Sequence, residues 1–259
     1  MSFKKSLLAT SLLVASVSAN AVVINPSADG TPTYDLQTIL NGITTGGTSS
    51  VDVQNDQLSD GLDSYWTLDS SGGSVSTFVF EIAGNSGINT FGVYDRSDAT
   101  KYVQLFGGSN APNAGFSSQV TVSILADGSV GLNGTDTGID FASNTFGYYL
   151  GNEAGAAGPA GNDPLFFSDS NLNTGLADMM VAFQGKGTDT ITIPGFGPGL
   201  WDTNEYLLAF EDVYGGDGDY NDLVVMVESV TPVSEPATLA LLGLGLAGLG
   251  FARRKQAKA

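Results

Sequence analysis

Short runs of β-branched and aromatic residues alternate along most of the chain with clusters of Gly, Asn, Asp and Ser. Such runs predict β-strands, because these side chains suit a pleated, half-buried surface. Within 119–125, Val120, Val122 and Ile124 fall on one face, and polar residues fall on the other. The expected strands are 65–68, 77–82, 90–94, 102–106, 119–125, 129–132, 146–150, 165–168, 179–184, 190–193, 206–210 and 223–227.

One segment has the spacing of an amphipathic helix, with apolar residues at Leu36, Ile39, Leu40 and Ile43. Asp127-Gly128 separates two expected strands and predicts a hairpin turn. Many short strands with frequent turns, and no repeat of fixed period, predict an all-β domain over residues 22–230. A β-sandwich or a jelly roll fits this pattern.

The first 21 residues have the three parts of a secretory signal peptide. Lys4 and Lys5 precede a short apolar run, and Ala19 and Ala21 fit a small-x-small cleavage site; Val17-Ser18-Ala19 is a second option. The apolar run is too short to span a bilayer. We therefore expect cleavage and export.

Residues 237–252 form an uncharged apolar run that is followed by Arg253, Arg254 and Lys255. As a helix this run would be about 24 Å long, short for a bilayer core of about 30 Å. We expect a transmembrane helix here rather than a buried core helix, because the run is apolar on all sides. The basic block would stay in the cytoplasm and place the preceding domain outside. Residues 231–233 are expected to form a linker.

Ser234-Glu235-Pro236, the apolar run and the basic block Arg253, Arg254 and Lys255 together resemble the PEP-CTERM sorting signal of Gram-negative bacteria. Ser234 stands where that signal usually has its first proline. The resemblance implies processing of the tail by an exosortase in bacteria that make exopolysaccharide. It also implies an inner-membrane-anchored intermediate facing the periplasm, and then delivery to the cell envelope or the extracellular space.

The charge and the missing residue types exclude several classes of function. The chain has 27 acidic and 9 basic residues, no His and no Cys. Histidine-dependent triads, thiolate nucleophiles and disulfides are therefore excluded. Without the two basic termini, residues 22–233 carry a net charge of −23, which disfavours nucleic acid as a partner. The available chemistry is that of oxygen ligands and hard cations.

The densest chemical feature is an acidic loop between two hydrophobic strands. Within 12 residues it holds Glu211, Asp212, Asp217, Asp219, Asn221 and Asp222. Ca²⁺ takes six to eight oxygen ligands, and this loop can supply them. We expect a structural calcium site with ligands from Asp217, Asp219, Asn221 and Asp222, and with Glu211 or Asp212 contributing from across the loop. The alternative is that these residues only shape turns.

Residues 205–227, with their FED and DGDYNDLVV segments, resemble the C-terminal half of domain of unknown function 4114. The phrases NTFGVYD (89–95), FGYYL (146–150) and MVAFQG (180–185) also look like these proteins. No enzymatic activity comes with this resemblance. A second acidic stretch, with Asp52, Asp56, Asp60 and Asp63, is expected to be a solvated loop.

The leading hypothesis is a non-enzymatic surface or extracellular-matrix protein. A calcium-dependent exopolysaccharide-binding module is the alternative, with stacking contacts from Trp66, Trp201, Tyr148, Tyr149, Tyr214 or Tyr220. We expect most of these rings in the core, with Tyr214 and Tyr220 the best candidates for exposed contacts. A glycoside-active enzyme is less favoured, because two carboxylates suffice for that chemistry but no catalytic motif is present.

Overall fold

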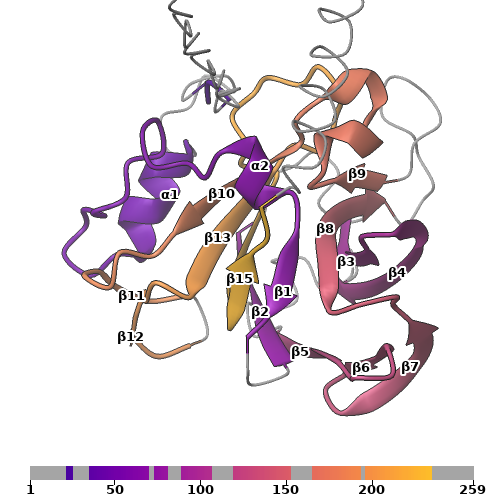
Figure 1. The fold of residues 1–259 in the computed structure, drawn as a ribbon. Coiled ribbons are helices and arrows are strands. Elements are labelled where there is room, and N and C mark those ends of the chain that lie inside the picture. The colour runs from indigo at the N-terminus through magenta and orange to yellow at the C-terminus, as the bar shows by residue number, and fades with distance from the viewer. Residues whose placement is uncertain are drawn as a thin grey trace, which may run out of the picture.

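The computed structural model describes residues 22–25, 35–69, 73–80, 89–106, 119–152, 165–193 and 196–234 (Figure 1). The predicted signal peptide and the apolar run 237–252 lie outside these residues. None of the helices in the described ranges has the length and apolar character needed to cross a bilayer.

The described elements are mostly β-strands, which confirms the all-β prediction. The two α-helices are α1 (Leu36–Ile43) and α2 (Asp60–Asp63), and the 3-10 helices are η3 (Ser170–Leu172) and η4 (Thr174–Leu176). The strands are β1 (Trp66–Leu68), β2 (Gly73–Phe80), β3 (Asn89–Asp95), β4 (Asp98–Phe106), β5 (Gln119–Ile124), β6 (Ser129–Leu132), β7 (Thr135–Asp140), β8 (Thr145–Asn152), β9 (Leu165–Phe167), β10 (Met180–Gln184), β11 (Thr190–Ile191), β12 (Gly199–Leu200), β13 (Glu205–Phe210), β14 (Leu223–Glu228) and β15 (Val230–Pro232).

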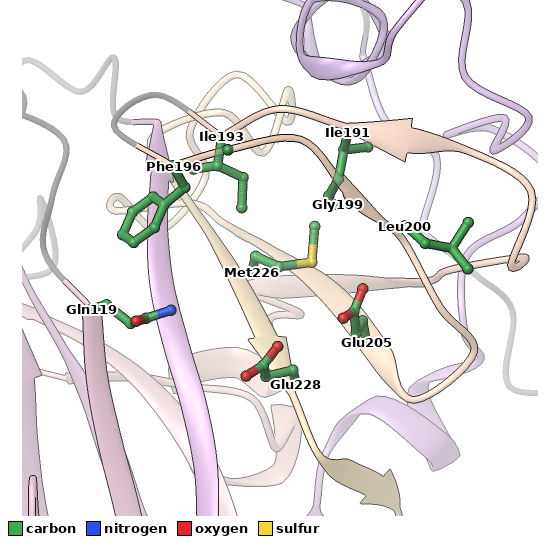
Figure 2. A pocket seen from close by; sticks show the side chains of 10 residues that line it. Gln119, Ile191, Ile193, Phe196, Gly199, Leu200, Glu205, Met226 and Glu228 are labelled. Carbon is green, nitrogen blue, oxygen red and sulfur yellow. The ribbon is translucent and has the colours of Figure 1, made fainter.

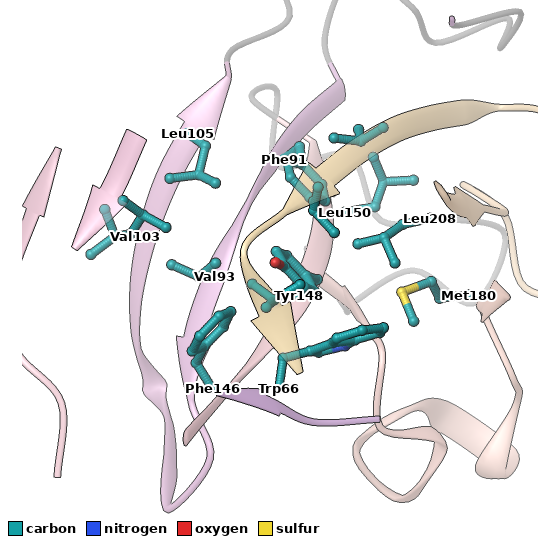
Figure 3. Packing of buried hydrophobic residues seen from close by; sticks show 14 of the residues in the cluster. Trp66, Phe91, Val93, Val103, Leu105, Phe146, Tyr148, Leu150, Met180 and Leu208 are labelled. Carbon is teal, nitrogen blue, oxygen red and sulfur yellow. The ribbon is translucent and has the colours of Figure 1, made fainter. Parts of the chain in front are cut away.

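The strands form two large antiparallel sheets and a small β11-β12 hairpin. The first sheet has the order β15-β1-β8-β3-β4, with β9 also paired to β8. The second has the order β10-β13-β14-β2-β5-β6-β7. A shared cluster of buried side chains joins the two sheets (Figure 3). Within it the ring of Trp66 from β1 meets that of Tyr206 from β13 edge to face, with centroids 4.8 Å apart.

Both faces of the second sheet are covered at β13 and β14, which explains why these two strands are hydrophobic without alternation. Tyr206, Leu208 and Phe210 belong to the cluster between the two sheets. Leu207 and Ala209, on the opposite face, join a second cluster that includes residues of α1 and β11. The strands β13 and β14 therefore lie between two buried apolar clusters.

Helix α1 matches the predicted segment. The side chain of Asp35 caps it by accepting a hydrogen bond from the Thr38 N–H (2.7 Å), which satisfies one of the free donors of the first turn. Leu36 and Leu40 are buried in the second cluster. The helix thus covers the outer face of the second sheet, on the side away from the first.

Two glycines in the first sheet lie beneath tyrosine rings of the neighbouring strand. Gly92 is paired with Tyr149 and Gly147 with Tyr94 across the β3–β8 ladder. A Cβ on Gly147 would lie 2.2 Å from Cζ of Tyr94, and one on Gly92 would lie 2.5 Å from Cε1 of Tyr149. The phrases FGVY and FGYY are thus the two halves of a reciprocal glycine–tyrosine arrangement.

The hairpin predicted at Asp127-Gly128 is present, since β5 pairs antiparallel with β6. The prediction of a linker at 231–233 is wrong. Thr231 and Pro232 belong to β15, which pairs with β1, and the Val233 N–H donates to the carbonyl of Tyr65 (2.8 Å). The backbone therefore stays bound to the first sheet until Val233.

Candidate metal centre

The acidic loop closes the central hairpin of the second sheet. Strands β13 and β14 pair from Glu205 with Glu228 to Phe210 with Leu223. Glu211 therefore leaves one strand where Asp222 enters the other. This brings residues that are 11 positions apart to the same end of the sheet.

Three carboxylates converge inside this loop. Glu211, Asp217 and Asp219 each offer an oxygen, and these oxygens all lie within 4.8 Å of one another. Glu211 and Asp219 are buried, and Asp217 is exposed. Oxygens at this separation can ligate a single cation, while the exposed side would leave room for water ligands.

The backbone of the loop is shaped to produce this convergence. Gly218 (φ +79°) and Tyr220 (φ +55°) both adopt the left-handed conformation, which turns the chain sharply on either side of Asp219. The Tyr220 N–H donates to Oε1 of Glu211 (2.8 Å). A Cβ on Gly216 would lie 2.4 Å from Oε2 of Glu211, so a larger residue here would displace this carboxylate.

Asn25, which precedes the domain's first helix, also binds the loop. Its N–H donates to the carbonyl of Gly218 (2.7 Å), and its side-chain amide donates to the carbonyl of Asp217 (3.1 Å). The loop is therefore fixed by contacts outside its own hairpin.

The other three predicted ligands lie differently. Asp222 accepts a hydrogen bond from the Asp212 N–H (2.9 Å), and Asp212 accepts one from the Asn89 side chain (3.1 Å). Asn221 turns its NH₂ group to Asp219 (2.6 Å). Neither Asp212 nor Asp222 belongs to the converging group. In this arrangement Asn221 positions Asp219.

The electrostatics of the loop are unfavourable without a cation. Burial raises the pKa of Glu211 to about 7, and the carboxylates of Asp217, Asp219 and Asp212 add to this effect. Burial, followed by the charge of Asp212, also raises the pKa of Asp222 well above its usual range.

The basic residues of 22–233 make their contacts elsewhere. Arg96 lies over the ring of Tyr65 at 4.5 Å, Lys101 donates to the carbonyl of Asp140, and Lys186 pairs with Asp56 at 2.6 Å. A divalent cation bound in the loop would supply the positive charge that these three residues do not bring there.

The expectation of a solvated second acidic stretch is wrong for Asp63. Its side chain is buried at the end of α2, and burial raises its pKa well above the usual value, with contributions from Asp178 and Asp60. Burial likewise raises the pKa of Asp178 to about 7. Asp178 had no signal in the sequence, because it lies alone before β10. Asp52 is exposed, as expected.

The predicted stacking residues are mostly core residues. Trp66, Trp201, Tyr148 and Tyr149 are buried, as the preferred interpretation had them. Tyr220, proposed as an exposed contact, is buried too, and its hydroxyl donates to the carbonyl of Asp178 (2.9 Å). Tyr214 is half-buried and packs edge to face on Phe166. These six residues therefore do not form an exposed aromatic platform.

Two known protein families match parts of this chain. Residues 133–230, which contain the acidic loop, match the domain of unknown function DUF4114, and residues 232–255 match the PEP-CTERM protein-sorting motif. The chain thus carries a PEP-CTERM sorting motif and, before it, a region that matches DUF4114. No curated protein and no solved structure matches it.

The DUF4114 match begins after β6, yet its strands depend on those that precede it. Strand β14 pairs with β2, and β8 pairs with β1 and β3. The PEP-CTERM motif begins at Pro232, inside β15. This motif implies export, a membrane-anchored intermediate at the C-terminus and sorting by an exosortase.

Proposed function

We propose that this PEP-CTERM protein is a non-enzymatic component of the cell surface or extracellular matrix whose DUF4114 region carries a structural Ca²⁺ site. In this proposal the tail anchors the chain in the inner membrane until an exosortase processes it. The domain is taken as a β-sandwich, because one apolar cluster draws side chains from both sheets.

The observation that carries the calcium site is the convergence of Glu211, Asp217 and Asp219 within 4.8 Å. The carboxylates of Glu211 and Asp219 accept hydrogen bonds from the N–H groups of Tyr220 and Asn221, so their oxygens are arranged before any ion arrives. Ca²⁺ suits the site, because its coordination is flexible and accepts water beside carboxylates. A cation would also stabilise the Glu211 carboxylate, whose pKa is raised by burial and, to a lesser extent, by the neighbouring acids.

The alternative of an exopolysaccharide-binding module loses its main support, since five of its six proposed stacking rings are buried. We therefore assign the domain no sugar-binding role of its own. A protein of this kind would instead act through its net charge of −23 over residues 22–233, which keeps copies apart and binds divalent cations.

The experiment is to recover the protein from the host that produces it and to measure its intact mass and metal content. We expect a mass that lacks the signal peptide and the tail after residues 234–236, with one Ca²⁺ per chain. The E211Q/D217N variant should be processed at the same two ends but should carry no Ca²⁺. The control D136N/D140N should be processed in the same way and should retain the Ca²⁺. A full-length mass would contradict the sorting part, and an absence of Ca²⁺ would contradict the metal part.

A further inference from the structure

A second site lies at the opposite end of the β13–β14 hairpin. A pocket of about 130 Å³ opens there on the outer face of the second sheet, under the β11-β12 hairpin (Figure 2). Two of its lining residues are Glu205 and Glu228, which are directly paired across the strands. Residues paired in this way have Cβ atoms about 4.5–5.5 Å apart, so two carboxylates enter one small space.

The remaining walls of the pocket are largely apolar. Met226 forms part of the wall next to Glu228, and Ile191 and Ile193 approach from the β11-β12 side (Figure 2). Phe196 and the exposed Leu200 lie nearer the solvent. Two acids beside buried aliphatic side chains are costly, because each carboxylate is partly desolvated and repels the other.

The two carboxylates differ in how they are held. Oε2 of Glu205 accepts a hydrogen bond from the Asp202 N–H (2.9 Å), which orients the carboxylate at the start of β13. Burial raises the pKa of Glu205, and the charges of Glu228 and Asp202 raise it further. Burial also raises the pKa of Glu228. The pocket therefore combines negative potential with an apolar lining.

This combination selects among cations. Ca²⁺ needs six to eight oxygens, and beside the oxygens of Glu205, Glu228 and Gln119 the thioether and alkyl groups of this pocket disfavour the water ligands that would complete its shell. A primary ammonium needs only three acceptors, and Glu205, Glu228 and the amide of Gln119 all line the same space. The apolar walls would then contact the carbon chain that bears the ammonium.

The size of the pocket limits the ligand. A cavity of about 150 Å³ in another protein accepts benzene, which has six heavy atoms. We propose that the Glu205–Glu228 pocket binds one primary ammonium group on an aliphatic stem of about four or five carbons. A free aliphatic amine and a lysyl side chain share this chemistry.

The test uses the full chain in mild detergent, with ¹³C-labelled methionine methyl groups. Of the three methionines in the described ranges, Met226 lines the pocket, whereas Met179 and Met180 lie in the cluster between the sheets. Titration with n-pentylammonium chloride should shift the Met226 signal saturably and leave those of Met179 and Met180 in place. Sodium chloride, pentanol and pentanoate at equal concentration should not reproduce the shift.

The E205Q/E228Q variant keeps the shape of both side chains and the acceptor for the Asp202 N–H. It should bind the amine at least about tenfold more weakly. D136N/D140N, which removes two exposed charges from β7, should bind as the parent chain does. Loss of repulsion should make E205Q/E228Q melt no lower than the parent, so weak binding will not reflect unfolding.

A second titration, with Nα-acetyl-lysine methylamide, separates the two sources of the ammonium. Binding of both probes assigns a site open to lysyl side chains, and binding of pentylammonium alone assigns a site for free amines. An unsaturable shift, an equal response to pentanol, or unchanged binding by E205Q/E228Q would each overturn the proposal. Calcium binding at the acidic loop is measured separately and does not bear on these outcomes.

Discussion

Glu211 accepts a hydrogen bond from the backbone N–H of Tyr220 (2.8 Å) and so ties the first residue after β13 to the turn that precedes β14. The same bond holds Glu211 beside Asp217 and Asp219. The geometry of the loop and the proposed metal site share this contact, and both can be tested by changes near it.

Calcium should stabilise the full chain through the three converging carboxylates. At about one hundred times the dissociation constant, binding adds about 2.7 kcal/mol, which corresponds to a rise in melting temperature of about 5–10 °C. E211Q/D217N should lose this rise, and D136N/D140N should retain it. The measurement is thermal unfolding with Ca²⁺ and with a chelator; an equal rise in both variants would argue against the site.

Gly216→Ala should disturb the loop directly. The new Cβ would lie 2.4 Å from Oε2 of Glu211 and 3.0 Å from the carbonyl of Val213, so the carboxylate must move. We expect a loss of about 1–3 kcal/mol in the free energy of unfolding and a weaker response to Ca²⁺.

Gly42→Ala is the control for that substitution. Gly42 lies in α1 with no atom within 4 Å of the new Cβ, and alanine should stabilise the helix by about 0.5–1 kcal/mol. Urea unfolding curves of the two variants should therefore shift in opposite directions. A shift of the same sign in both would contradict the assigned role of Gly216.

The acids near α2 should make stability fall as pH rises. The folded-state pKa of Asp178, about 7, lies above its value of about 3.9 in an unfolded chain, so the folded state binds the proton more tightly. The free-energy cost of holding Asp178 ionised in the folded protein is absent below pH 4. It grows as pH rises and is complete above pH 7. Asp178→Asn should therefore stabilise the protein by about 1–3 kcal/mol at pH 8 and by little at pH 4.

Asp98→Asn is the matched control for the pH series. The Thr100 hydroxyl and N–H lower the pKa of Asp98, so removing this charge should not stabilise the protein at pH 8. Chemical unfolding of both variants at pH 4 and pH 8 makes the comparison. A gain at pH 8 shared by both would point to net charge rather than to the site of Asp178.

The glycine–tyrosine arrangement of the first sheet should appear as coupling between residues. Gly147→Ala places a Cβ 2.2 Å from Cζ of Tyr94 and should destabilise the fold by about 1–3 kcal/mol. With Tyr94→Ala already present, the same change should cost less, which gives a coupling of about 0.5–3 kcal/mol. A double-mutant cycle by urea unfolding measures it, and simple additivity would rule the contact out as the cause.

The alternation and turn signals located much of this fold, including α1 and the hairpin around the acidic loop. They missed β7, because its sequence TDTGID has polar residues on both faces and its side chains are exposed or half-buried. They also missed β15, since Thr231 and Pro232 carry no apolar pattern. Pairing with neighbouring strands, rather than an alternating apolar pattern in the sequence, determines strands of this kind.

The density of acidic residues in the sequence located the candidate site, but it did not show which of these residues converge. Six residues were proposed as ligands, and three of them converge. The distinction depends on hydrogen bonds that charge density does not reveal, since the side chain of Asn221 donates to Asp219 and Asp222 accepts from the Asp212 N–H. Burial of Asp63 was equally hidden, because it follows from packing between α2 and distant segments.

The attachment of β15 also determines how the domain meets mechanical load from its anchor. Among the described strands, Val230–Pro232 form the edge of the first sheet and pair with β1. A pull on the tail away from the sheet would open the contact of Val233 with Tyr65 first and then the pairs of β15 in sequence. Backbone hydrogen bonds that are loaded one after another break at a lower force than bonds loaded together. Strand β15 would therefore detach from β1 before the hairpin of β13 and β14 unfolds.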